Sequence, residues 1–353
     1  MKNQLKNFIK QFKKTSVKPF TGINIESSAL CNLKCWICPT QFYSGPATRG
    51  NMSMETFRKL LPFFKQVVNV DLTGWGEPLL NPNLFEMAIL AKKAGCPSVT
   101  LTTNGTLLNA ENIERIISTE IDALSVSIDS ATKETHVKLK KGSDFSQVIS
   151  AIQELITRRN SSGSKRPYVS ASFLLMRDNM EEIPRFTDLM AKLNVNDVAF
   201  KNLSAVFSPE VMSQVIYEGY YSVRADCEGR DKYIAEAKQL AEKNGIKLIF
   251  HGNFFAERIN DCLIMPLDYP FIGWNGDVAP CCILGHPVTQ LGKNGNGIAG
   301  GVLSFGNVNE ESLDRIWYKE RYIELRRKII AGKIPEECGD CLGLYSVSGS
   351  PLR

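Results

Sequence analysis

The segment GINIESSALCNLKCWICP, residues 22–39, joins a short apolar-alternating run to three closely spaced cysteines. Residues 22–27 are typical of a strand, and Cys31, Cys35 and Cys38 follow in the next loop. Three thiolates alone cannot complete a tetrahedral zinc site. They can bind three irons of a four-iron four-sulfur cluster and leave the fourth iron open to a ligand. Zinc with a distant fourth ligand is the alternative, which the presence of only three histidines weakens.

Strand and helix patterns alternate after this loop, which predicts an α/β fold with a parallel sheet and outer helices, closed as a barrel or left open. The further strands are expected at residues 68–73, 98–102, 123–128, 168–175, 197–200 and 246–250. The helical patterns cover residues 54–67, 84–94, 110–118, 145–158, 180–193, 231–244 and 312–331. An Asn-Gly turn predicts a hairpin over residues 269–279.

Glycines and polar side chains follow the predicted strands at the point where each strand ends. Ligands bind at the carboxyl ends of the strands in such folds, so these residues should meet at one mouth. Glycines allow close backbone approach to a ligand, and carboxylates accept hydrogen bonds from ammonium and hydroxyl groups. The candidate ligand-binding residues are Gly74, Gly76, Glu77, Asn104, Ser127 and Asp129.

A second group of cysteines lies near the end of the chain. Cys262 and Cys281 flank the predicted hairpin, and Cys338 and Cys341 follow the last predicted helix. Four thiolates from two chain segments suit a structural zinc or a complete iron–sulfur cluster. Cys282 is an alternative to Cys281 as the ligand.

The three-cysteine loop and the strand-end residues, in this order, resemble the radical S-adenosylmethionine (SAM) superfamily. Gly74, Gly76 and Glu77 are similar to its Gly-Gly-Glu motif, with Trp75 inserted. Ser127 and Asp129 resemble the ribose-contacting end of its fourth strand. The resemblance implies that the open iron binds SAM, whose reductive cleavage gives a 5′-deoxyadenosyl radical that abstracts a substrate hydrogen.

The second cysteine group resembles the auxiliary-cluster region of SPASM and twitch members of that superfamily, in the shorter twitch form because no cysteine follows Cys341. The resemblance implies two 4Fe–4S clusters, one binding SAM and one auxiliary, with Cys262, Cys281, Cys338 and Cys341 as the auxiliary ligands. It implies a partial (β/α)6 barrel over residues 22–250 and a small α+β twitch-type domain over residues 251–353. Residues 1–21 precede these as a predicted amphipathic helix.

The composition of the chain indicates which partners and which cellular compartment to expect. Lys plus Arg is 42 against Asp plus Glu 37, a net charge of +5 that is too small to indicate a nucleic-acid partner. No apolar run is long enough for a membrane span, and no secretory signal is present. Clustered thiols in such a chain favour metal or redox chemistry in the reducing cytoplasm.

The expected reaction is the dehydrogenation of a small polar metabolite, with the auxiliary cluster relaying an electron and a flavodoxin or ferredoxin as reductant. Alternatives are a peptide-modifying maturase acting on an externally presented peptide, a radical epimerase with Cys227 or Cys282 as hydrogen donor, and a zinc-bound scaffold. Weaker site candidates are Lys140 and Lys141 for the methionyl carboxylate, Asp268, Asp277 and Tyr345 as bases, and the strand-end residues Arg177, Asp178, Lys201 and Asn202.

Overall fold

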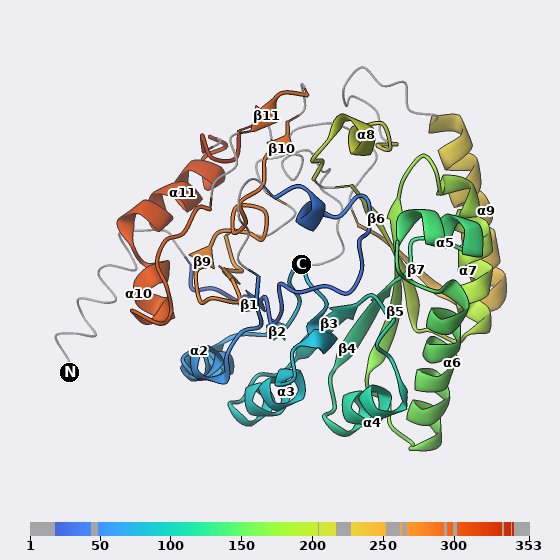
Figure 1. Ribbon diagram of the computed structural model, residues 1–353, viewed down its shortest axis with the longest axis horizontal. Helices are drawn as coiled ribbons and strands as arrows, with labels where there is room; N and C mark the ends of the chain where they lie inside the picture. The colour runs from blue at the N-terminus through green and yellow to red at the C-terminus, as the bar shows by residue number, and fades with distance from the viewer. Residues whose placement is uncertain are drawn as a thin grey trace.

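One open sheet organises the chain (Figure 1). The computed structural model describes residues 18–43, 49–203, 205–216, 227–251, 262, 267–292, 295–298, 302–333, 335–339 and 341. The sheet has the order β7-β6-β5-β4-β3-β2-β1-β8-β9. Its strands are β1 (Gly22–Ile25), β2 (Asn69–Asp71), β3 (Val99–Thr103), β4 (Ala123–Ser127), β5 (Tyr168–Leu175), β6 (Asp197–Asn202), β7 (Lys247–His251), β8 (Phe271–Ile272) and β9 (Val278–Ala279).

Strands β1 to β7 are parallel and lie in chain order, and β7 does not pair with β9. The α/β partial barrel is therefore confirmed, with the predicted 246–250 segment as its seventh strand. The predicted hairpin is present as β8 and β9, but β8 also pairs in parallel with β1. The core sheet thus continues into the C-terminal region. A small antiparallel pair, β10 (Gln290–Leu291) with β11 (Gly297–Ile298), lies apart from it.

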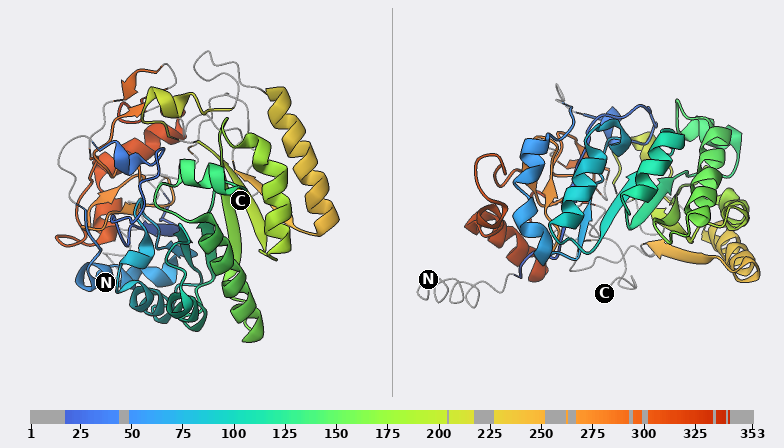
Figure 2. Two further views of the ribbon diagram at one scale, coloured as in Figure 1. Left: turned by 45° about the vertical axis from the view of Figure 1, so that its right-hand side comes forward. Right: turned by 90° about the horizontal axis from the view of Figure 1, so that it is seen from below.

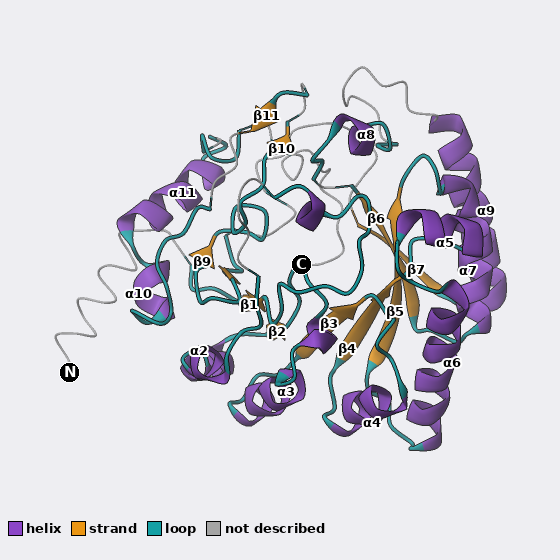
Figure 3. Ribbon diagram, in the orientation of Figure 1, coloured by secondary structure: helices purple, strands orange, loops and turns teal. Residues whose placement is uncertain are grey.

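The helices lie around the sheet, most of them against its outer face (Figure 3). They are α2 (Met54–Arg58), α3 (Leu84–Lys93), α4 (Ala110–Ser118), α5 (Lys133–Leu139), α6 (Phe145–Ser161), α7 (Ile183–Lys192), α8 (Pro209–Met212), α9 (Cys227–Asn244), α10 (Leu313–Trp317) and α11 (Glu320–Ile330). Side chains that accept hydrogen bonds from the first turn fix several starts, as Asn109 does for α4 and Asp144 for α6.

Two expected helices are each split. The 54–67 pattern forms α2 and then a 3-10 helix over Leu61–Gln66, because Pro62 lacks the N–H that a continuing α-helix needs. The 312–331 pattern breaks between α10 and α11, where the Arg326 guanidinium donates to the Trp317 carbonyl at 2.5 Å. That bond satisfies a carbonyl at the end of α10.

Alternate residues of the strands face opposite sides of the sheet. In β2 and its continuation, Val70 and Leu72 are fully buried in the core beneath the helices, so Asn69 and Asp71 face the barrel interior. The core beneath the helices is apolar, whereas the interior carries polar side chains. This asymmetry leaves the interior suited to a polar ligand.

The C-terminal helices pack against the start of the described chain (Figure 2). The Trp317 indole Nε1 donates to the Lys18 carbonyl at 3.1 Å. The indole also packs edge-to-face against the Phe20 ring, with 5.5 Å between the ring centroids. No described helix has the length and apolar character needed to cross a bilayer.

Candidate functional site

The three early cysteines lie in the loop that leaves β1. Loops from other strands hold this loop in place: the Glu77 N–H donates to the Leu30 carbonyl at 2.7 Å, and the Lys34 N–H donates to the Lys141 carbonyl at 3.0 Å. Within the loop, the Cys38 N–H donates to the Cys35 carbonyl at 3.0 Å. The loop is therefore positioned by the segments that follow β2 and α5.

The electrostatics of this loop fit a cluster of thiolate ligands. The pKa of the Cys35 thiol is raised to about 11, mainly by burial and also by the charges of Cys38 and Cys31, while Lys140 opposes the rise. Burial likewise raises the pKa of Cys31, with Cys38 contributing. The three thiols disfavour one another's thiolate forms electrostatically, and a bound cationic cluster would relieve that repulsion. The trio thus suits a cluster with one iron left open.

Gly74 and Gly76 let the loop after β2 lie against the loop after β1. A Cβ on Gly74 would sit 2.1 Å from the Glu26 Cγ, and one on Gly76 would sit 2.3 Å from the Leu30 carbonyl oxygen. Both contacts are far closer than atoms tolerate. The close approach seen here is between two protein loops, and direct contact of these glycines with SAM stays a prediction.

Glu77 joins the ends of β2 and β3. Its carboxylate is 2% exposed and accepts hydrogen bonds from the Thr103 hydroxyl at 2.8 Å and the Asn104 N–H at 2.8 Å. The Asn104 side-chain amide in turn contacts the Cys31 Sγ at 4.0 Å. Glu77 is largely engaged by the protein, whereas Asn104 lies beside the cysteine loop.

Ser127 and the buried Asp129 and Lys140 form one group at the end of β4. The Lys140 Nζ lies 2.9 Å from the Asp129 carboxylate and donates to the Ser127 hydroxyl at 3.0 Å. Asp129 has a positive φ of 64°, and the Asn179 amide binds its backbone carbonyl at 2.9 Å. The predicted pair Ser127 and Asp129 therefore meets, and Lys140 brings a positive charge to Cys35.

Trp75 and Glu26 connect the barrel to the C-terminal region. The Trp75 ring stacks on the His286 ring, with 4.0 Å between the ring centroids and an angle of 10° between the ring planes. The buried Glu26 carboxylate accepts from the Trp75 N–H at 3.0 Å and lies 3.0 Å from the His286 Nε2. Since His286 Nδ1 also lies 2.7 Å from the Cys282 carbonyl, this junction positions the second cysteine group.

A cavity of about 350 Å³ opens inside the barrel beside this junction. Its lining comprises Asn24, Asn69, Asp71, Thr73, Gly74, Trp75, Tyr269, Phe271, Cys281 and Cys282. The Thr73 hydroxyl donates to Asp71 at 2.6 Å, and burial raises the pKa of Asp71 to about 6. The Asn69 Oδ1 is shielded and has no hydrogen-bond partner among the described residues. A polar cavity with a high-pKa carboxylate is suited to a substrate.

Sequence reasoning missed Asp71, although a signal was present. Strands of a parallel sheet covered on both faces are usually apolar throughout. The alternation of Asn69, Asp71 and Thr73 with buried valine and leucine departs from that pattern. This alternation therefore predicts that the barrel interior is polar.

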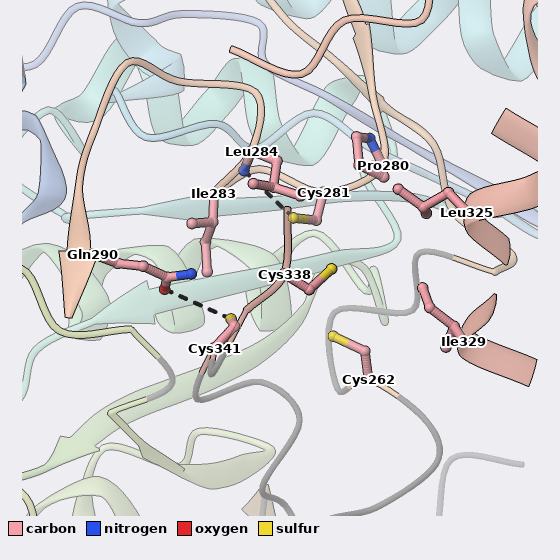
Figure 4. Close-up of a pocket in the computed structure, with 10 residues that line it drawn as sticks. All are labelled: Cys262, Pro280, Cys281, Ile283, Leu284, Gln290, Leu325, Ile329, Cys338 and Cys341. Carbon is pink, nitrogen blue, oxygen red and sulfur yellow. Dashed lines mark hydrogen bonds between the residues drawn. The ribbon is translucent and has the colours of Figure 1, made fainter. Parts of the chain in front are cut away.

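The later cysteines line a separate apolar pocket (Figure 4). Its lining comprises Cys262, Pro280, Cys281, Ile283, Leu284, Gln290, Leu325, Ile329, Cys338 and Cys341. Burial raises the pKa of Cys338 to about 12 and that of Cys281 well above its usual value. Four thiols in one apolar pocket fit a cluster whose irons are all bound by protein. Cys282 lines the barrel cavity instead, where Trp75 is its hydrogen-bond partner.

The remaining candidates are dispersed. Asp277 accepts hydrogen bonds from the Asn275 and Asn307 amides in the β8–β9 turn. Asp178 pairs with Lys138 at 2.6 Å, and the Asp268 carbonyl accepts from the Thr21 N–H at 2.9 Å. The predicted N-terminal helix (but for residues 18–21), Tyr345 and the Cys227 side chain lie outside the described part of the chain.

Two family models match this chain: the radical SAM superfamily over residues 25–190 and the SPASM iron–sulfur cluster-binding domain over residues 262–342. Each match contains one of the two cysteine groups. Together they assign SAM and two iron–sulfur clusters as the cofactors, as the sequence predicted.

Several known proteins are similar over most of their length. The tungsten-containing aldehyde ferredoxin oxidoreductase cofactor-modifying protein of Pyrococcus furiosus is 26% identical over 321 residues, covering 90% of this chain and 86% of that protein. The AdoMet-dependent heme synthase of Methanosarcina barkeri is 27% identical over 348 residues, with the same coverage. Streptococcus suis SuiB bound to S-adenosylmethionine shares the fold, with a TM-score of 0.66 at 18% identity over 92% of this chain and 72% of that one. The chain therefore belongs to the radical SAM superfamily and is a radical SAM enzyme of the subgroup that carries a SPASM iron–sulfur domain.

Proposed function

We propose that this enzyme dehydrogenates a small polar molecule held in the barrel cavity, with the auxiliary cluster accepting the electron that the substrate gives up. The observation that carries this proposal is the shared wall: Cys281 lines both the barrel cavity and the auxiliary pocket. A substrate in the cavity would therefore lie next to a ligand of the auxiliary cluster. The first cluster and SAM supply hydrogen-atom abstraction when they are bound.

The cavity supplies the other groups that such a reaction needs. Oxidation of a CH–OH group to a carbonyl removes one hydrogen atom, one proton and one electron. Asp71 is the proton acceptor, because it lines the cavity and its raised pKa of about 6 lets it take up a proton near neutral pH. SAM bound at the first cluster would supply the acceptor of the hydrogen atom, and a cluster held by Cys262, Cys281, Cys338 and Cys341 would supply the acceptor of the electron beside the Cys281 wall.

Radical epimerisation is a second candidate, because Cys282 lines the same cavity. An epimerase returns a hydrogen atom to the opposite face of the substrate carbon, and a thiol is suited to donate it. In that reaction no net electron leaves the substrate. The two candidates differ in whether solvent deuterium enters the product.

The test is anaerobic reconstitution of the full chain with iron counting, followed by incubation with SAM, reductant and small polar metabolites, including alcohols, in deuterium oxide. We expect about eight irons, as two four-iron clusters give, and one 5′-deoxyadenosine per oxidised product without deuterium at carbon. Deuterium that enters the product and is lost in Cys282→Ala would establish epimerisation instead. Two zinc ions without iron, or product formation from a peptide alone, would overturn the proposal.

The matched variants are Cys338→Ala with Cys341→Ala, which remove two auxiliary ligands and leave the first cysteine loop intact. We expect them to retain 5′-deoxyadenosine formation and to lose the oxidised product. Full product formation by this double variant would show that the auxiliary cluster takes no electron from the substrate.

A further inference from the structure

Lys201 is a positive charge inside the barrel. On β6, Phe200 is fully buried and its ring meets Phe186 of α7 at 6.4 Å, so this residue faces the outer helices. The next residue along a strand faces the opposite side, which places the half-buried Lys201 toward the interior. Its neighbours in register are Leu174 of β5 and His251 of β7.

No hydrogen bond or ion pair joins the Lys201 side chain to any described residue, although three carboxylates act on its charge. Each of these carboxylates has partners of its own. Asp129 pairs with Lys140 at 2.9 Å, Asp197 accepts from the Tyr168 hydroxyl at 2.9 Å, and Asp71 accepts from Thr73 at 2.6 Å. The half-buried Lys201 thus has no direct counter-ion among the described residues, an arrangement that costs free energy unless a further partner completes it.

We propose that Lys201 binds an anionic group of the substrate, a carboxylate or a phosphate, at the end of the barrel interior that lies across from Asp71. This inference rests on the proposed function, because it names the class of molecule that the same interior accepts. Asp71 and Lys201 act on each other electrostatically without forming an ion pair, so their charged atoms lie more than 4.0 Å apart.

The two ends of the interior then have different roles. The Asp71 end adjoins Trp75 and Cys281, so the reacting carbon and its hydroxyl lie there. The Lys201 end provides orientation, because an ammonium is a strong donor to anionic oxygens. Shielded polar atoms of Asn69 and Ser125, which lack partners among the described residues, are available to the uncharged middle of the molecule. The substrate class is a small polyfunctional acid or phosphate ester with an oxidisable alcohol.

Competitive acetylation tests this site without knowledge of the substrate. The reconstituted full chain with SAM is treated anaerobically with limiting acetic anhydride, and mass spectrometry measures the acetylation rate of each lysine. Burial lowers the pKa of Lys201, which favours the neutral amine that attacks the anhydride. The probes are sodium formate and inorganic phosphate, each at constant ionic strength set with chloride, and glycerol is the neutral control. At ten times the half-protecting concentration we expect about tenfold slower labelling.

Lys192 is the matched control, since its side chain is 72% exposed on α7 and its rate should not change. Formate protection indicates a carboxylate substrate, and phosphate protection indicates a phosphate ester. Asp71→Asn should lower the half-protecting concentration several-fold, because it removes a negative charge that faces the bound anion. Equal labelling with and without both anions, or a Lys201 that is unreactive throughout, would overturn the anion site.

The same preparation separates this inference from the proposed function. Protection of Lys201 in a protein that forms no 5′-deoxyadenosine-dependent product from any alcohol leaves the anion site standing and overturns the dehydrogenase assignment. Turnover of a neutral alcohol with no protection of Lys201 would support the dehydrogenase assignment and overturn the anion site.

Discussion

The two cysteine sites of this chain differ in how they are built and in what surrounds them. Cys31, Cys35 and Cys38 lie within eight residues of one loop, beside the buried Lys140–Asp129 ion pair. The auxiliary cysteines lie on either side of the β8–β9 hairpin and beyond α11, and the other residues of their pocket are mostly aliphatic. The first site is therefore charged and local, and the second is apolar and assembled by the fold.

This difference matches two kinds of chemistry. A cluster that binds a charged cofactor gains from nearby polar groups such as Asn104 and Ser127, which can interact with that cofactor. A cluster that only passes electrons needs no open coordination position, and an apolar lining excludes water and competing ligands. The barrel cavity adjoins the auxiliary pocket at Cys281, so under the proposed reaction an electron would have a short path into the apolar site.

The largest effect should follow from removal of the first site. Cys31→Ala, Cys35→Ala and Cys38→Ala combined should abolish 5′-deoxyadenosine formation and lower the iron content from about eight to about four per chain. The physical reason is that no other described thiol can replace three ligands of one loop. Iron analysis and chromatography of the quenched reaction measure both quantities. Retention of 5′-deoxyadenosine formation would show that the two sites are not specialised as described.

The first site was the more predictable of the two because its residues are close in sequence. The spacing of its three cysteines, and the meeting of Ser127 with Asp129 after one strand, follow from local chain geometry. The parallel order of β1 to β7 follows from the strand and helix alternation. The end of the α-helix before Pro62 could also have been predicted from the sequence, because proline lacks the N–H that continues a helical hydrogen-bond series.

Long-range packing was harder to predict. The pairing of β8 with β1 joins segments almost 250 residues apart, and no local pattern records that partnership. The role of Glu77 as a hydrogen-bonded link to Thr103 and Asn104 depends on the register of β2 against β3. The position of Cys282 in the barrel cavity, apart from the neighbouring Cys281, depends on the hydrogen bond between His286 and its backbone carbonyl.

The ion pair of the first site should dominate its stability. Lys140→Met leaves the buried Asp129 carboxylate without its cation, which costs about 3–5 kcal/mol in the free energy of unfolding. Adding Asp129→Asn should restore most of this loss, because asparagine is neutral and tolerates the positive φ at this position. Anaerobic urea titration followed by circular dichroism measures the change.

The control for that prediction lies on the neighbouring helix. Lys138 is 62% exposed and pairs with Asp178, so Lys138→Met should cost less than about 1 kcal/mol. If the two lysine variants lose equal stability, the contrast between a charged first site and an apolar second one has no energetic basis.

Asp71→Asn tests the cavity that lies between the two regions. Loss of the proton acceptor should lower product formation about a hundredfold, while 5′-deoxyadenosine formation continues. In the unmodified enzyme, product formation should rise as the pH increases through about 6, because Asp71 then loses its proton, and the variant should lack this rise. A variant with the same pH profile would exclude Asp71 as the base.

Asp71→Asn should lower activity but should not lower the stability of the folded chain at high pH. The pKa of Asp71 in the folded chain lies above its ordinary value of 3.8, so the stabilising contribution of its proton is complete below pH 3.8 and is lost as the pH rises through about 6. At pH 8 the folded chain therefore carries a destabilising buried charge, and Asp71→Asn should unfold at an equal or higher urea concentration. A marked loss of stability at pH 8 would indicate a structural role instead.

The smallest effect is expected at Cys282, and it sharpens the comparison most finely because Cys281 is the adjacent residue. Cys281→Ser should lose the auxiliary cluster, since this side chain shares its pocket with Cys262, Cys338 and Cys341. Cys282→Ser should keep about eight irons and unchanged product formation, because its thiol lies in the barrel cavity beside Trp75 and an oxidation uses no hydrogen donor. Iron content and turnover of the two serine variants, compared side by side, measure this contrast. Loss of four irons in Cys282→Ser would place this cysteine in the auxiliary cluster and reverse the assignment of the two neighbours.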